Sequence, residues 1–130
     1  MTGRLNKKTI IITGAGSGLG RASAIKLAEE DAQVFCVDVN PETVKETSDI
    51  ITSRGGAASH YQADMCSETE IIAMVTEAEK TYNGIDGLLA NAGIAGTGAA
   101  HETSLEDWDR LIKVSLTGKW LCAKHVIPHF

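Results

Sequence analysis

The sequence predicts an α/β fold in which helices cover both faces of a parallel sheet. Short β-rich runs alternate with segments of helical periodicity, the order expected when crossover helices join parallel strands in a right-handed sense. The first run, at residues 9–13, reads TIIIT and is continuously apolar, which is typical of a strand buried on both faces. No linker, repeat or low-complexity tract interrupts the pattern, so we expect residues 1–130 to form a single, partial domain.

The predicted strands are separated by helices with clear capping signals. Strands are expected at residues 9–13, 33–39, 57–63 and 85–90, and helices at residues 18–30, 41–53, 68–81 and from 105 toward the C-terminus. Asn40, Ser67 and Ser104 precede helices as N-caps, and glycines follow the second and third helices. These connections predict a doubly wound parallel sheet, truncated after about four strands, with the strand order 3-2-1-4.

Composition restricts the partners that the protein can bind. The net charge of -5 disfavours nucleic acid and anionic membranes, because both require a basic face. No apolar run reaches the length of a membrane span, and the apolar stretch near the N-terminus is too short for a signal peptide, so we expect a cytoplasmic protein. The three cysteines follow no metal-ligand spacing and are expected to be reduced and mostly buried, with no metal bound.

A glycine-rich turn, TGAGSGLG at residues 13–20, joins the first strand to the first helix. A diphosphate requires close backbone approach and free N–H groups beside the positive end of a helix dipole, and this turn offers both. The context predicts a Rossmann-type dinucleotide site, and the alternative is a flexible turn without a ligand. The residues expected to bind the dinucleotide here are Gly14, Gly16, Ser17, Gly18, Leu19 and Gly20.

Asp38 ends the second predicted strand and favours NAD over NADP. Its carboxylate can accept hydrogen bonds from the adenosine ribose hydroxyls of NAD, and the same charge repels the 2′-phosphate of NADP. Ser17 is neutral, and no arginine or lysine stands among the residues directly after Asp38. The alternative is that Asp38 caps a helix at the end of the strand or is a solvated charge.

With these motifs the chain resembles the short-chain dehydrogenase/reductase family over essentially its whole length. The glycine turn matches the family pattern T-G-x-x-x-G-x-G, and Asp38 matches the acidic strand end of NAD-using members. The resemblance implies hydride transfer between NAD and an alcohol or ketone. It also implies that Asp64 and Met65 lie at the adenine ring. The N-A-G motif, formed by Asn91, Ala92 and Gly93, is implied to support the sheet and to lie beside the coenzyme.

Two departures from the family pattern concern catalysis. Ser115, in the segment VSLTG, occupies the position of the family's catalytic asparagine, and its shorter side chain reaches less far toward a relay water. The family's catalytic serine and its Tyr-x-x-x-Lys pair are both missing. The residue four positions after Tyr61 is Met65, and the residue four positions after Tyr82 is Asp86, so neither tyrosine has the lysine that the pair requires. We therefore expect weak NAD binding and no dehydrogenase activity from these 130 residues alone, and an alcohol or ketone partner only in a longer chain.

The last predicted helix carries apolar residues on two sides. One stripe covers the sheet and the other indicates a partner helix, and the resemblance places this helix in a dimer interface, so we expect a homo-oligomer. The alternative is one wide core face. The first stripe is Leu105, Trp108, Ile112, Leu116 and Trp120, and the second is Leu111, Val114, Leu121 and Val126.

Several other patterns receive no chemical role. His125 and His129 share a helical face without a third metal ligand, and Asp86 is expected to bond locally at the start of a strand. The acidic run at Glu68, Glu70, Glu77 and Glu79 is interpreted as a solvated helix face.

Two further functions stay open. One is a non-catalytic module that binds NAD or pairs with longer relatives. The other is a methyltransferase-like nucleotide fold, which Thr13 disfavours because those folds place an acidic residue before the glycines.

Overall fold

The computed structural model describes residues 2–96 and 98–130. Its centre is a parallel sheet with the order β3-β2-β1-β4, which confirms the predicted α/β class and strand order. The strands are β1 (Thr9–Thr13), β2 (Gln33–Asp38), β3 (Ala57–Gln62) and β4 (Gly87–Leu89). In the register, Thr13 faces Val37 and Asp38 faces Gln62, so the carboxyl ends of β1, β2 and β3 lie along one edge of the sheet.

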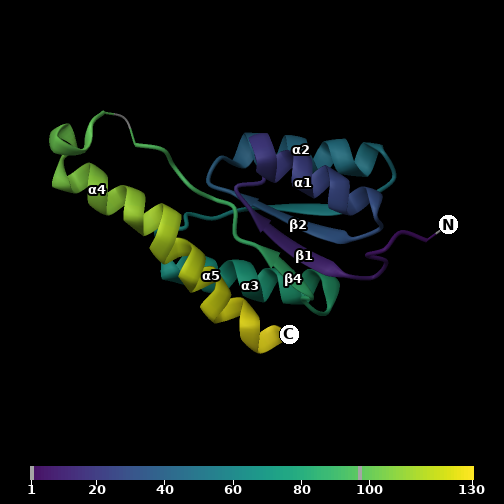
Figure 1. Ribbon diagram of the computed structural model, residues 1–130. Helices are drawn as coiled ribbons and strands as arrows, with labels where there is room; N and C mark the ends of the chain where they lie inside the picture. Colours follow the sequence, from purple (N-terminus) through teal and green to yellow (C-terminus); the bar gives the residue numbers. More distant parts are fainter. Residues whose placement is uncertain (1, 97) are drawn as a thin grey trace.

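Helices form a layer on each face of the sheet (Figure 1). The helices α1 (Gly18–Glu29) and α2 (Pro41–Ser53) cover one face, and α3 (Glu68–Tyr82) and α5 (Gly118–Val126) cover the other. Neighbouring residues of β1 belong to different cores: Ile11 packs with the α3 and α5 side, and Ile12 packs with the α1 and α2 side. Both are fully buried, which is why β1 is continuously apolar.

Three strands are shorter than the sequence predicted. β2 and β3 each end one residue early, so Val39 and Ala63 follow the ladder instead of joining it. β4 spans only three residues, because the Asn91 amide turns back to the Leu89 carbonyl at 3.0 Å and ends the strand. α1 ends one residue earlier than predicted and α3 one residue later.

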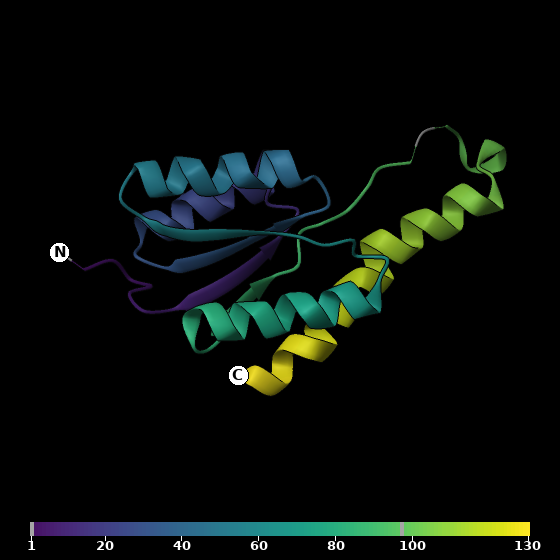
Figure 2. The same cartoon turned by 180° about the vertical axis from the view of Figure 1, so that it is seen from behind.

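The sequence predicted one helix from residue 105 toward the C-terminus, but the structure divides this last helical segment into four elements. It consists of α4 (Leu105–Ile112), a π-helical turn η2 (Lys113–Thr117), α5, and a terminal 3₁₀ turn η3 (Ile127–His129). A π turn adds one residue to the helical repeat and turns the faces on its two sides relative to each other. The chain before it forms a short 3₁₀ turn, η1 (Ala100–Glu102), and α4 projects beyond the sheet (Figure 2).

The predicted N-caps of three helices are confirmed. The Asn40 side chain accepts hydrogen bonds from the amides of Glu42 and Thr43 at 3.0 and 3.2 Å. The hydroxyl of Ser67 caps α3 and that of Ser104 caps α4, at 3.2 and 3.1 Å. The expectation of a local bond for Asp86 is wrong, because its carboxylate accepts from the amide of Thr9, 77 positions away at the start of β1, at 2.8 Å.

Two members of the acidic run, interpreted from the sequence as a solvated face, also join α3 to the last helical segment. Glu68 contacts both the Lys124 ammonium, at 3.1 Å, and the His125 ring, at 2.8 Å. Glu79 contacts the His129 ring at 3.1 Å. The two histidines that the sequence placed on one face are thus each paired with a glutamate.

The two apolar stripes of the last helical segment differ sharply in burial. Leu121 and Val126 are buried against the sheet and α3, whereas Trp108, Leu116 and Trp120 are 57%, 63% and 60% exposed. The idea of one wide core face is therefore wrong. Among residues 2–96 and 98–130, no helix combines the length and apolar character needed to cross a bilayer.

Candidate functional site

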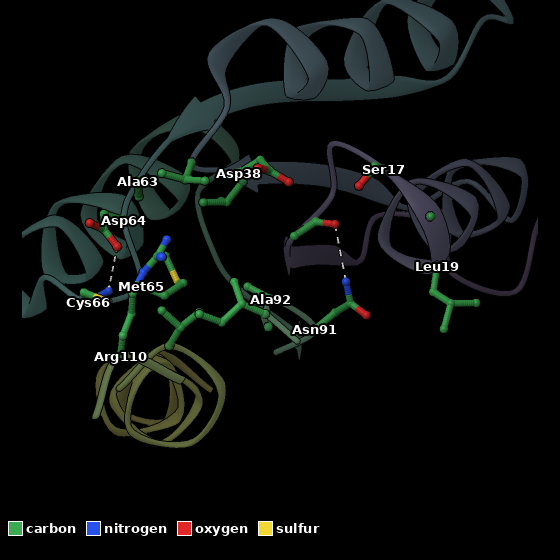
Figure 3. A pocket seen from close by; sticks show the side chains of 17 residues that line it. Ser17, Leu19, Asp38, Ala63, Asp64, Met65, Cys66, Asn91, Ala92 and Arg110 are labelled. Carbon is green, nitrogen blue, oxygen red and sulfur yellow. Dashed lines mark hydrogen bonds between the residues drawn. The ribbon is translucent and has the colours of Figure 1, made fainter. Parts of the chain in front are cut away.

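A cleft of about 500 Å³ opens at the carboxyl edge of the sheet (Figure 3). It lies where the chain leaves each of the four strands, which is where parallel α/β sheets hold ligands. Its wall on the other side is the last helical segment. The lining residues are Gly14, Ser17, Gly18, Leu19, Val37, Asp38, Val39, Ala63, Asp64, Met65, Cys66, Asn91, Ala92, Gly93, Ile94, Arg110 and Val114.

Glycines allow the turn after β1 to pack closely. Gly14 has φ +66°, and a Cβ there would lie 2.9 Å from the Ala92 Cα. A Cβ at Gly20 would collide with the Gly14 carbonyl and approach the Asn91 Nδ2 to 2.7 Å. Gly20 therefore lets α1 begin directly on the turn, and it lies behind the cleft instead of lining it.

The N-terminus of α1 is left without a side-chain cap. Ser17 occupies the N-cap position but makes no side-chain hydrogen bond to the helix, and the first turn of α1 contains no acidic residue. By contrast, α2, α3 and α4 are each capped by a side chain. Because Ser17, Gly18 and Leu19 line the cleft, the positive end of the α1 dipole and its unbonded amides are directed into it.

Asp38 is held by backbone amides on both of its oxygens. Oδ2 accepts a hydrogen bond from the Gly16 amide at 2.9 Å, and Oδ1 accepts one from the Asn40 amide at 3.1 Å. The Gly16 N–H is therefore bonded to Asp38, and Gly16 does not line the cleft. The carboxylate nevertheless lines the cleft and has lone pairs for further donors.

Thr13 and Asn91 join the ends of β1 and β4. The buried Thr13 hydroxyl accepts hydrogen bonds from the amides of Asn91 and Ala92, each at 3.0 Å. The Asn91 side chain donates in return to the carbonyls of Thr13 and Gly14, at 3.2 and 3.3 Å. These bonds fix the N-A-G segment against the glycine turn, a role of Thr13 that sequence reasoning missed.

The segment after β3 forms the far end of the cleft. Asp64 accepts a hydrogen bond from the Cys66 amide at 2.9 Å, and Met65 is buried beneath it. Cys66 is partly exposed, and burial and the Asp64 carboxylate raise the pKa of its thiol. The other two thiols are buried, as expected, and burial raises the pKa of Cys36 to about 12 and that of Cys122 to about 11.

Ser115 bonds to the loop after β4 and does not line the cleft. Its hydroxyl accepts from the Ile94 amide at 3.2 Å and lies 3.3 Å from the Ile94 carbonyl, to which it donates. Ser115 lies at the centre of the π turn, and the turn brings it beside Gly93. The structure therefore gives this serine a role in positioning the loop.

Sequence reasoning did not identify the residues of the last helical segment that line the cleft. Arg110 and Val114 lie one helical turn apart and face the cleft together. That spacing was visible in the sequence, but nothing local showed which side of the helix faces the sheet. Neither tyrosine lines the cleft, and burial raises the pKa of Tyr82, the opposite of what an acid–base tyrosine needs.

Comparisons with known proteins agree with this geometry. The family model described as short chain dehydrogenase matches residues 8–130. An uncharacterised oxidoreductase of Bacillus subtilis is 39% identical over 127 residues, which are 97% of this chain and 46% of that relative. The 2-(S)-hydroxypropyl-CoM dehydrogenase 3 of Xanthobacter autotrophicus is 36% identical over 124 residues, 95% of this chain and 49% of that protein.

A solved structure is similar at the level of the fold. The carveol dehydrogenase from Mycobacterium avium in complex with NAD matches with a TM-score of 0.93 and 28% identity, over 98% of this chain and 51% of that one. This chain thus spans about half the length of the curated relatives and solved structures that it matches.

Proposed function

This chain belongs to the short-chain dehydrogenase family, and on that premise we propose that its cleft binds the adenosine and diphosphate of NAD. The single observation that carries the proposal is the meeting of an uncapped α1 N-terminus and the Asp38 carboxylate at one cleft. A helix N-terminus favours a diphosphate, and a carboxylate at a strand end favours ribose hydroxyls. Membership of this family also argues against the methyltransferase-like alternative.

The residues present fit this coenzyme in shape as well as in charge. Gly18 lines the cleft, and a Cβ there would meet no atom of the chain within 4 Å, so the turn is open toward the cleft at this position. The Gly16–Asp38 bond fixes the carboxylate on the side of the glycine turn. A 2′-phosphate at the same ribose would meet this negative charge, so we propose that NAD binds more tightly than NADP.

We propose that the whole protein is an NAD-dependent oxidoreductase that acts on an alcohol or ketone. When bound, NAD supplies the hydride acceptor or donor for that chemistry. The residues of this chain hold and orient the coenzyme, and Ser115 positions the loop beside it through Ile94. No Tyr-x-x-x-Lys pair occurs among the 130 residues, so we expect them to bind NAD without turning it over.

Calorimetric titration of the chain with NAD and NADP tests the proposal, with Asp38→Asn as the decisive variant. The asparagine Oδ1 can still accept a backbone hydrogen bond but carries no charge. Loss of a charge-assisted hydrogen bond costs about 1.5 kcal/mol or more, so NAD should bind roughly tenfold more weakly. NADP should lose less, because the repulsion of its phosphate is also removed.

Asp49→Asn is the matched control for Asp38→Asn. Asp49 lies on α2 outside the cleft and pairs with Lys45 at 2.6 Å, so its variant loses the same charge away from the site. We expect its affinity for NAD to equal that of the unaltered chain. A chain that binds neither dinucleotide, or that prefers NADP, would contradict the proposal.

A second candidate function is self-association through the last helical segment. The exposed apolar side chains of this segment favour such an association. Leu105, Trp108, Leu116 and Trp120 are all exposed along the last helical segment, and so much exposed apolar surface is costly in water unless a partner covers it. We propose that a second copy covers this surface. Leu116→Glu should then shift the sedimentation coefficient toward that of a monomer, whereas Lys119→Glu, outside the stripe, should not. A monomeric unaltered chain would refute the idea.

A further inference from the structure

Arg110 stands at the outer end of the cleft on the wall formed by α4. Figure 3 shows its side chain rising from the helix toward the segment of Asp64 and Cys66. Lys113 and Arg110 both lie close enough to Cys66 for their charges to act on its thiol. Arg110 is therefore on the α4 wall of the cleft and faces the segment after β3, which carries the Asp64 carboxylate.

Arg110 also differs from the other arginines in its partners. Arg4, Arg21 and Arg54 pair with Glu30, Glu46 and Glu29, respectively, at 3.2, 3.0 and 4.0 Å. Within the described part of the chain, no carboxylate lies at ion-pair distance from the Arg110 guanidinium. The side chain thus presents an unpaired, planar cation to the cleft.

The surroundings of Arg110 match a flat, aromatic ligand better than a phosphate. Val114 lies one turn along the same wall, and Val39 and Ala63 line the cleft after β2 and β3. Apolar side chains that share a cleft with a planar guanidinium suit a heterocycle, since guanidinium stacks on aromatic faces. The backbone amides suited to a phosphate lie at the α1 N-terminus, on a different wall of the cleft.

We propose that Arg110 is a coenzyme-binding residue whose guanidinium stacks on the adenine ring of the bound nucleotide. The inference rests on the proposed function, because it assigns a contact within the NAD site. It gives α4 a direct part in holding the coenzyme, although α4 projects beyond the sheet (Figure 1). Val114 contributes the apolar continuation of the same surface.

Saturation-transfer NMR and calorimetry with Arg110→Ala test the contact, with NAD, AMP and inorganic pyrophosphate as probes. A cation–aromatic contact at an exposed site is worth about a two- to fivefold change in affinity. We expect NAD and AMP to bind more weakly by this factor and the adenine protons to lose saturation relative to the ribose protons. The affinity for pyrophosphate should stay unchanged, because pyrophosphate has no ring.

Two further variants separate stacking from charge. Arg110→Lys keeps the charge without the plane and should regain only part of the affinity lost in Arg110→Ala, because an ammonium can lie over a ring but cannot stack flat on it. Lys113→Ala removes a nearby cation that does not line the cleft and should bind all three probes as the unaltered chain does.

Four results would overturn the assignment: full affinity in Arg110→Ala, full rescue by Arg110→Lys, an equal loss in Lys113→Ala, or an equal loss of pyrophosphate binding. If the unaltered chain binds neither NAD nor AMP, the proposed function itself fails, which is a distinct outcome.

Discussion

Replacing Thr13 by valine should loosen the link between β1 and β4 while preserving the shape of the side chain. The Thr13 hydroxyl accepts two amides at 3.0 Å and is almost completely buried. The Asn91 amide keeps a second acceptor, the Leu89 carbonyl at 3.0 Å, but in the described part of the chain the Ala92 amide has no other. A half-buried amide left without an acceptor costs about 1–2 kcal/mol, so we expect Thr13→Val to lower the free energy of unfolding by that amount.

Urea unfolding followed by far-ultraviolet circular dichroism measures this loss. Thr9→Val is the matched control, because Thr9 is buried at the opposite end of the same strand and, among the residues that the structure describes, its hydroxyl bonds only to the Gln33 side chain, at 3.1 Å. The control should lose clearly less stability, since the Gln33 amide can turn to water. Equal midpoints for Thr13→Val and the unaltered chain would refute the reasoning that Thr13 holds the two strand ends together.

Three other perturbations follow from the same contacts. Alkylation of Cys66 should be slow at neutral pH, because burial and the Asp64 carboxylate raise the pKa of its thiol. The rate should increase with rising pH and decrease when NAD is added, and mass spectrometry of the labelled peptide measures both effects. Glu68→Gln should lower the melting temperature at neutral pH. His125 and Lys124 hold the pKa of Glu68 below its usual range, so the Glu68 carboxylate stabilises the fold at neutral pH. This stabilisation should disappear in acid, where Glu68 is protonated in both the folded and the unfolded chain. Gly20→Ala should destabilise the chain by about 1–3 kcal/mol in urea unfolding, because its methyl group would collide with the Gly14 carbonyl; unchanged stability would contradict this packing.

Local signals in the sequence were sufficient for the element order and for part of the site. The side chains of Asn40, Ser67 and Ser104 cap helices as predicted, since a cap acts within three residues of its own position. The glycine turn and Asp38 were found in the same way, because the strand–turn–helix pattern around them is continuous in sequence. The exposed stripe on the last helical segment was also predicted from its periodicity.

What the sequence by itself determined about this protein is therefore its α/β class, its strand order, and the presence of a turn and a carboxylate suited to a dinucleotide. Only the tertiary structure decided how these parts meet. The Thr13–Asn91 bond joins residues 78 positions apart, and the Gly16–Asp38 bond joins the glycine turn to the end of β2, 22 positions away. Such contacts form after strands pair, so no local pattern encodes them. The same holds for Arg110, because the π turn and the packing of α5 determine which face of α4 is directed toward the cleft.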